Sequence, residues 1–129
     1  WVLVDLSTFK MLKSDNIYPS GEFIESTLFK DKLIKPMNVV SDENYLCDYT
    51  VVKSDIDIYH HMNNAKYAEL LFDYCDYKAV EIGHFAVNYI NQIKQNMVMK
   101  IYKYEEDLKT YITGICDGVI IFTSVVDKK

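Results

Sequence analysis

The sequence predicts an α+β fold in which an antiparallel sheet wraps around one long central helix. Three observations lead to this class. From Asn64 onward the polar residues recur with helical spacing, which indicates a mostly apolar helix. Four runs rich in Val, Ile, Tyr and Phe follow that helix, as is typical of strands. The joins between these runs are short and polar, and strands joined in this way pair antiparallel.

The chain before the helix contains two strand-like stretches separated by a long connection. Residues 1–6 predict a strand that is already under way, and residues 44–53 predict a second one. Residues 7–37 carry Pro and Gly and are expected to connect the two. Because the first residue is Trp1 and not Met, we expect the sequence to be a piece of a longer protein.

The expected helix has one narrow polar stripe, formed by Lys66, Glu69, Asp73 and Asp76. Its other faces are apolar, so other structure should cover most of it. Asn63 or Asn64 suits the N-cap, because a side-chain oxygen there can accept from a free N–H of the first turn. Gly83 is a plausible end of the helix.

The four strand-like runs after Gly83 cover residues 84–93, 97–105, 110–116 and 119–126. Asp117-Gly118, between the last two runs, is the strongest hairpin signal among the joins. A single helix this apolar must lie against the concave face of a curved sheet. The outer edge of the sheet and the open side of the helix would then still need a partner.

Composition and charge exclude several classes of function. The formal net charge is −5 and every basic residue is a Lys, so bidentate Arg contacts to nucleic acid are impossible. No apolar run approaches the roughly 20 residues that cross a bilayer, and we expect no membrane partner. The four glycines form no nucleotide-binding motif, and no cofactor is expected. Cys47, Cys75 and Cys116 are too few and too widely spaced for a disulfide framework or a zinc site, which favours the reducing cytoplasm.

Residues 54–64 gather acidic, imidazole, phenol and amide side chains directly before the expected helix: Asp55, Asp57, Tyr59, His60, His61, Asn63 and Asn64. The free N–H groups of a helix N-terminus can hold an oxyanion or a polarised carbonyl. A His and an Asp beside it supply general acid and base groups, which suits acyl transfer or hydrolysis. The alternative is that the asparagines only cap the helix and the histidines are incidental. A metal site is disfavoured, because neighbouring histidines point in different directions and no third ligand has suitable spacing.

The same segment resembles the signature of the acyl-ACP thioesterase family, Asp-x-Asn-x-His-x-Asn-Asn-x-Lys-Tyr. The matching residues are Asp57, His61, Asn63, Asn64, Lys66 and Tyr67. The resemblance implies two hotdog folds in tandem, of which the C-terminal one carries the catalytic residues. Residues 1–37 would then be the tail of a preceding hotdog and a connecting segment, and residues 38–129 the C-terminal hotdog. Residues 88–93 are similar to the strand that follows the helix in this family.

The resemblance also implies an activity and roles for single residues. The reaction would be hydrolysis of fatty acyl-ACP to a free fatty acid and acyl carrier protein. His61 would act as general base or align the water, and Asp57 would orient a partner or assist at the thioester. Backbone N–H groups around Asn63–Ala65 would polarise the thioester carbonyl, and Asn64 would support or cap that arrangement.

Two positions depart from the family pattern, although we keep both as candidate catalytic positions. Tyr59 stands where the signature has Asn, and Gln92 stands where an acidic residue is expected on the strand after the helix. A Gln can hold a water but cannot take its proton, and the loss of a general base costs roughly 10²–10⁴-fold in rate. Two alternatives therefore stay open: a single-hotdog acyl-CoA thioesterase, and a catalytically weak acyl-binding module. The expected partners are an acyl carrier protein or CoA thioester as substrate and a second hotdog, either from the same full-length chain or, for the single-hotdog alternative, from a homodimer mate.

Overall fold

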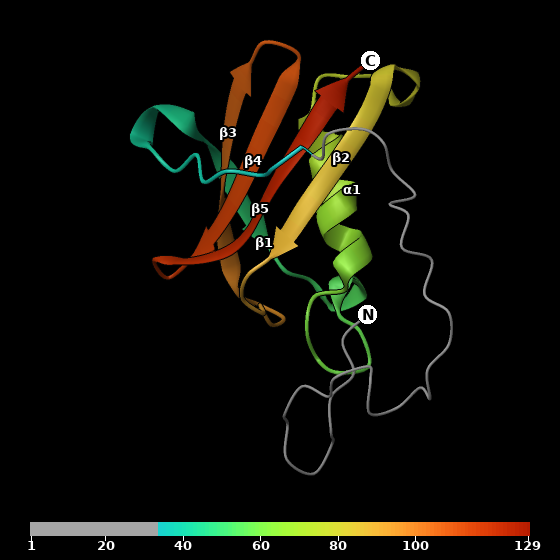
Figure 1. Ribbon diagram of the computed structural model, residues 1–129. Coiled ribbons are helices and arrows are strands. Elements are labelled where there is room, and N and C mark those ends of the chain that lie inside the picture. Colours follow the sequence, from blue (N-terminus) through green and yellow to red (C-terminus); the bar gives the residue numbers. More distant parts are fainter. Residues whose placement is uncertain (1–33) are drawn as a thin grey trace, which may run out of the picture. The chain divides into compact units, whose positions relative to one another are not determined.

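The computed structural model describes residues 34–129, which form a five-stranded antiparallel sheet and one α-helix (Figure 1). In chain order the elements are η2 (Asp42–Asn44), β1 (Tyr45–Thr50), η3 (Lys53–Asp55), α1 (Asn64–Tyr74), η4 (Ala79–Glu81), β2 (Ile82–Tyr89), β3 (Val98–Glu106), β4 (Lys109–Cys116) and β5 (Val119–Lys128). The strand order is β1-β3-β4-β5-β2, and every neighbouring pair is antiparallel. The predicted fold class is confirmed. The strand expected at residues 1–6 lies outside the described residues.

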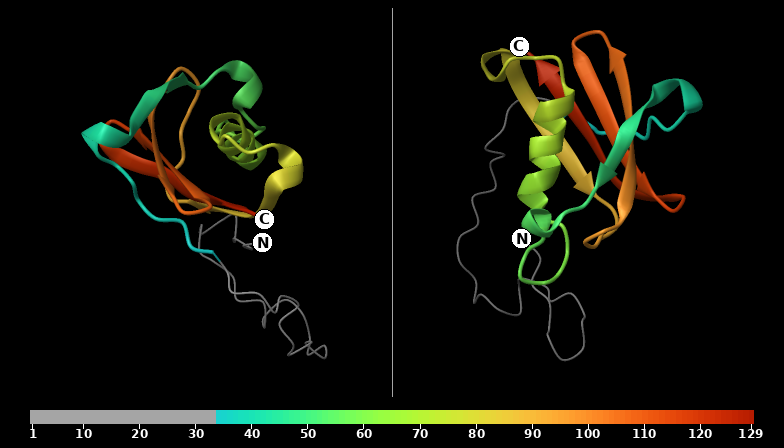
Figure 2. Two further views of the ribbon diagram at one scale, coloured as in Figure 1. Left: turned by 90° about the horizontal axis from the view of Figure 1, so that it is seen from above. Right: turned by 180° about the vertical axis from the view of Figure 1, so that it is seen from behind.

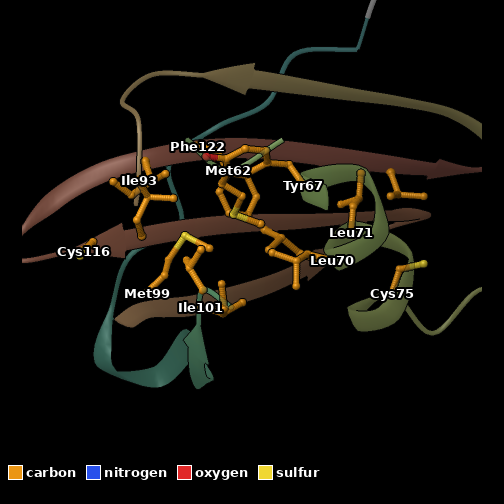
Figure 3. Close-up of a cluster of buried hydrophobic side chains, with 14 residues drawn as sticks. Met62, Tyr67, Leu70, Leu71, Cys75, Ile93, Met99, Ile101, Cys116 and Phe122 are labelled. Atoms are coloured by element: carbon orange, nitrogen blue, oxygen red, sulfur yellow. The ribbon is translucent and has the colours of Figure 1, made fainter. Parts of the chain in front are cut away.

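The sheet curves around α1, which lies along its concave face (Figure 2). The helix contributes Tyr67, Leu70 and Leu71 to the core, and the strands contribute apolar side chains from the facing positions (Figure 3). Leu71 and Phe122 are among the largest fully buried side chains. Burial of one such side chain is worth about 1.5–3 kcal/mol. This packing holds the first turn of the helix in a fixed position against the sheet.

The helix is shorter and less covered than its sequence predicts. It ends at Tyr74, and Cys75 takes extended backbone angles (φ −84°, ψ 145°). The carboxylate of Asp76 then pairs with the amine of Lys103 on β3, with an N–O distance of 2.6 Å. The expected end at Gly83 is wrong, since Gly83 lies within β2. One side of the helix is open, and Phe72 is 41 % exposed there.

The join between β2 and β3 is not a hairpin, which corrects the expectation drawn from its length. β2 pairs with β5, and the ladder ends where the N–H groups of Ile90 and Asn91 both donate to the carbonyl of Ile121. The strand expected over residues 84–93 therefore ends at Tyr89. The chain then continues as an irregular connection whose Ile93 is fully buried.

The other two hairpins form as predicted. Asp117 and Gly118 have φ values of 49° and 76°, the left-handed angles that a tight turn between β4 and β5 requires. Asp107 has a φ of 54° at the turn between β3 and β4. On the convex face, Val39 is buried against Tyr111 and Val125, so residues before β1 cover part of that side of the sheet.

Candidate active site

A closed loop joins η3 to α1, and the carboxylate of Asp57 organises it. Asp57 Oδ1 accepts hydrogen bonds from the N–H groups of Tyr59 (2.8 Å) and His61 (3.3 Å). The N–H of Asp57 donates to the carbonyl of His61 at 2.9 Å, and His60 has a left-handed φ of 64°. Asp and Asn side chains favour such turns, because they bond to the backbone two residues on. One carboxylate oxygen of Asp57 is thus used to fold the loop.

Both ends of this loop are anchored to the body of the protein. The N–H of Met62 donates to the carbonyl of Ile93 at 3.0 Å, and the N–H of Asn63 donates to the carbonyl of Asp55 at 2.8 Å. Asp55 is buried, and its Oδ2 accepts from the hydroxyl of Tyr49 at 2.7 Å. Burial and this bond to Asp55 raise the pKa of Tyr49 well above its usual value, so its hydroxyl stays a donor. The loop therefore presents its side chains from a rigid base.

The first turn of α1 uses most of its backbone donors internally. Asn63 is the N-cap, and its side-chain oxygen accepts from the N–H of Ala65 at 2.9 Å. The N–H of Lys66 donates to the carbonyl of Asn63 at 2.9 Å. Within residues 34–129, the N–H of Asn64 has no such acceptor. The partial positive charge of the helix N-terminus is therefore available chiefly through Asn64.

An open cavity of about 380 Å³ lies at this N-terminus. It is lined by the loop, the first turn of α1, and the end of β2 with the connection after it. The lining residues are Asp57, Tyr59, His61, Met62, Asn64, Tyr67, Tyr89, Ile90, Asn91 and Gln92. The fold thus brings the distant Gln92 to the same cavity as the loop.

The predicted site residues do not all take part in this cavity. Asp57, Tyr59, His61, Asn64 and Gln92 line it, whereas Asn63 and Ala65 do not and meet each other in the cap. Tyr59 is 73 % exposed, and Gln92 is exposed as well. Gln92 lies in the connection after β2 and not on a strand, because the ladder to β5 has already ended.

Two aromatic residues of the cavity were not predicted as site residues. Tyr89 donates its hydroxyl to the carbonyl of Asn64 at 3.3 Å. The buried ring of Tyr67 meets the rings of Tyr89 and Phe122 edge-on, with centroids 5.3 and 5.2 Å away. Burial, and then the neighbouring Tyr89, raise the pKa of Tyr67 to about 12. The position of Tyr67 at the end of the matching motif could have pointed to the cavity.

The cavity combines apolar side chains with acid, base and hydrogen-bonding groups. Across residues 34–129, no three His, Cys, Asp or Glu side chains are grouped to hold a metal ion. In the same part of the chain, no helix has the length and apolar character that a membrane crossing requires. A carboxylate and an imidazole beside a helix N-terminus can activate water toward a carbonyl group.

A comparison with protein-family models decides the family of this chain. The model described as the acyl-ACP thioesterase C-terminal domain matches residues 40–120, well over half of the 129 residues. The chain belongs to the acyl-ACP thioesterase family. Within this family, it corresponds to the C-terminal part of the protein. A search of curated proteins found no significant match.

Solved structures of acyl-ACP thioesterases share the fold. The enzyme from Bacteroides thetaiotaomicron and the 12:0-ACP thioesterase from Umbellularia californica each have a TM-score of 0.70 and 19 % identity over 98 % of this chain. The match covers 53 % and 52 % of those chains, so this chain spans about half their length. A Staphylococcus aureus protein solved in complex with CoA has a TM-score of 0.54 and 20 % identity over 64 % of this chain and 72 % of its own.

Proposed function

We propose that the cavity at the N-terminus of α1 hydrolyses the fatty acyl thioester of acyl carrier protein, releasing a free fatty acid and ACP. The observation that carries this proposal is the convergence of Asp57, His61 and Asn64 on one cavity in a member of this family. Water adds to the thioester carbon, and the carbon–sulfur bond then breaks. The thiolate leaves and takes up the proton that the base removed from water. Such a reaction ends acyl elongation on ACP, which would place the protein in fatty acid biosynthesis.

Each residue of the loop has a role in this proposal. Asp57 uses Oδ1 to hold the N–H groups of the loop, which leaves Oδ2 to accept from the attacking water or from an imidazole. His61 takes the proton from water, and the N–H of Asn64 donates to the carbonyl oxygen. Gln92 and Tyr59 orient the water at the open side of the cavity. Because neither Gln nor a neutral phenol is a strong base at neutral pH, the proton transfer falls to His61 and Asp57.

A second hotdog is part of the proposal. Strand β2 is an edge strand of the described sheet. The ring of its Phe85 contacts the ring of Phe72 on α1, with centroids 5.3 Å apart, and both residues are more than two-fifths exposed. An exposed apolar sheet edge of this kind is usually buried by a further structural element or a partner protein. The chain spans about half of the two acyl-ACP thioesterase chains, which supports a cover from the same full-length chain. A homodimer mate is the alternative cover.

Two other functions have a specific observation in their favour. The Staphylococcus aureus protein was solved with CoA, which keeps an acyl-CoA thioesterase as a candidate. Gln92 in the cavity favours a module that binds acyl chains with weak turnover. All three cysteines are free thiols, which supports the proposal of a reducing compartment such as the cytoplasm.

The experiment is a thiol-release assay on the full-length protein with acyl-ACP and acyl-CoA series of increasing chain length. We expect turnover on acyl-ACP, a lower kcat/KM on acyl-CoA, and a loss of roughly 10²–10⁴-fold in His61→Ala. His84→Ala is the matched control, because His84 is an exposed imidazole on β2 outside the cavity. A kcat/KM that is higher on acyl-CoA than on acyl-ACP favours the acyl-CoA thioesterase. Tight acyl binding without turnover favours the acyl-binding module.

A further inference from the structure

Tyr67 is buried at the cavity, and its hydroxyl has no hydrogen-bond partner among residues 34–129. The residue is 3 % exposed and lines the cavity. Within residues 34–129, no side chain or backbone group bonds to this hydroxyl, although buried hydroxyls normally have a partner. No fully inaccessible side-chain oxygen or nitrogen in this part of the chain lacks a partner, so the Tyr67 hydroxyl keeps some accessible surface, and the residue lines the cavity.

The helix brings Tyr67 and the free backbone donor of Asn64 to the same cavity. Residues three apart lie on the same side of a helix, and both Asn64 and Tyr67 line the cavity. Long side chains on a helix point back toward its N-terminus, so the Tyr67 phenol lies over the first turn. Figure 3 shows the Tyr67 side chain extending from the helix toward Met62 and Phe122.

Neighbouring aromatic rings fix the Tyr67 ring in this direction. Phe122 and Tyr89 contact it edge-on, a geometry that aromatic pairs favour. Tyr89 is itself held by its bond to the carbonyl of Asn64. The ring cannot swing away without disturbing the core, so its hydroxyl is a preorganised donor. Since its pKa is raised to about 12, the phenol keeps its proton at neutral pH.

An oxyanion in this cavity needs more than one donor, and the first turn offers few. The N–H groups of Asn63, Ala65 and Lys66 are already bonded within the protein. The Tyr89 hydroxyl donates to a backbone carbonyl, and Tyr59 is largely in solvent, where water competes for its bonds. Among the phenols that line the cavity, Tyr67 therefore combines burial with a hydroxyl that has no partner within residues 34–129.

We propose that the Tyr67 hydroxyl and the Asn64 N–H together bind the carbonyl oxygen of the thioester. This inference rests on the proposed hydrolase function and assigns a further residue to it. When water adds to the carbonyl carbon, the electron pair of the carbon–oxygen double bond moves to the oxygen, and both hydrogen bonds strengthen. When the carbon–sulfur bond breaks, that pair reforms the double bond. Tyr67 keeps its proton throughout and takes no part in the acid–base steps.

The test compares Tyr67→Phe with Tyr74→Phe in the full-length protein. Tyr74 is a partly buried phenol on the same helix that does not line the cavity, so its variant controls for the loss of a hydroxyl. For Tyr67→Phe we expect kcat to fall about 10²-fold with KM and the melting temperature nearly unchanged, as for the loss of one oxyanion donor. Tyr74→Phe should keep its kcat within about twofold. Equal kcat values for Tyr67→Phe and the wild type would overturn the inference.

A binding measurement separates this inference from the proposed function. One probe is an acyl-pantetheine ketone, in which a methylene replaces the sulfur and the carbonyl remains. The other is an alkyl thioether, in which a methylene replaces the carbonyl. If wild-type protein shows no turnover, the proposed hydrolase fails, and the ratio of the two affinities still tests Tyr67. We expect the wild type to prefer the ketone and Tyr67→Phe to lose most of that preference. An unchanged ratio contradicts the role of Tyr67 whatever the turnover.

Discussion

The replacement Gln92→Glu tests what the missing carboxylate costs this protein. Gln92 lines the cavity and is exposed, and Glu has nearly the same shape. The change therefore needs no repacking and no burial of charge. A water-exposed Glu has a pKa of about 4.3, so it is a carboxylate at neutral pH and can take a proton from water. General-base catalysis is worth roughly 10²–10⁴-fold, and we expect kcat to rise toward the lower end of that range because His61 already serves as base in the proposed mechanism.

The assay is thiol release from acyl-ACP by the full-length protein, measured across the pH range in which the fold is stable. Gln95→Glu is the matched control, because Gln95 is an exposed Gln of the same connection outside the cavity. The rise in Gln92→Glu should extend to lower pH than the wild-type activity does, since the new base stays ionised there. If Gln92→Glu and Gln95→Glu have the same kcat, Gln92 does not face the attacking water, and its place among the site residues is wrong.

Two further predictions concern stability. Gly114→Ala should destabilise the fold by about 1–3 kcal/mol in urea unfolding, because a new Cβ would collide with the ring of Phe122. Gly83→Ala serves as the control, because a Cβ at Gly83 would lie 3.5 Å from its nearest neighbours. The hydrogen bond and charge of Lys103 lower the pKa of Asp76. This pair therefore stabilises the fold fully at pH values above the unfolded-state pKa of about 3.9. The stabilisation is lost as the pH falls through the lowered pKa of the folded state. Asp76→Asn should therefore make the free energy of unfolding less dependent on pH in the acid range. An unchanged pH dependence would contradict the contribution of the Asp76–Lys103 pair.

Local patterns predicted the helix, its cap and most strands, because these depend on residues close in the sequence. Asp117-Gly118 and the polar residues before Asn64 are signals of this kind. The pairing of β2 with β5 could not be predicted, since it depends on which distant strands meet. The early end of the helix at Tyr74 likewise has no Gly or Pro beside it to mark it in the sequence.

The part of the candidate site that is contiguous in the sequence could be predicted, and the part that depends on the fold could not. The motif singled out Asp57 and His61 before the helix, and both line the cavity, while their catalytic roles stay a prediction. Tyr67 was missed as a site residue, because helical periodicity assigns a buried Tyr to the core. It does belong to the core, but it also lines the cavity, and only the three-dimensional arrangement shows both facts. The choice of Asn63 over Asn64 as the N-cap was also not predictable from the sequence.

The most direct measurement of the central claim is the rate of acyl-ACP hydrolysis by Asp57→Asn in the full-length protein. The side-chain oxygen of Asn can still accept the N–H groups of Tyr59 and His61, so the loop keeps its shape while the charge is lost. We predict a rate roughly 10²–10⁴-fold below wild type with an unchanged melting temperature, while Asp48→Asn, an exposed carboxylate on β1, stays near wild type. An Asp57→Asn protein that hydrolyses acyl-ACP at the wild-type rate would contradict the placement of the reaction at this cavity.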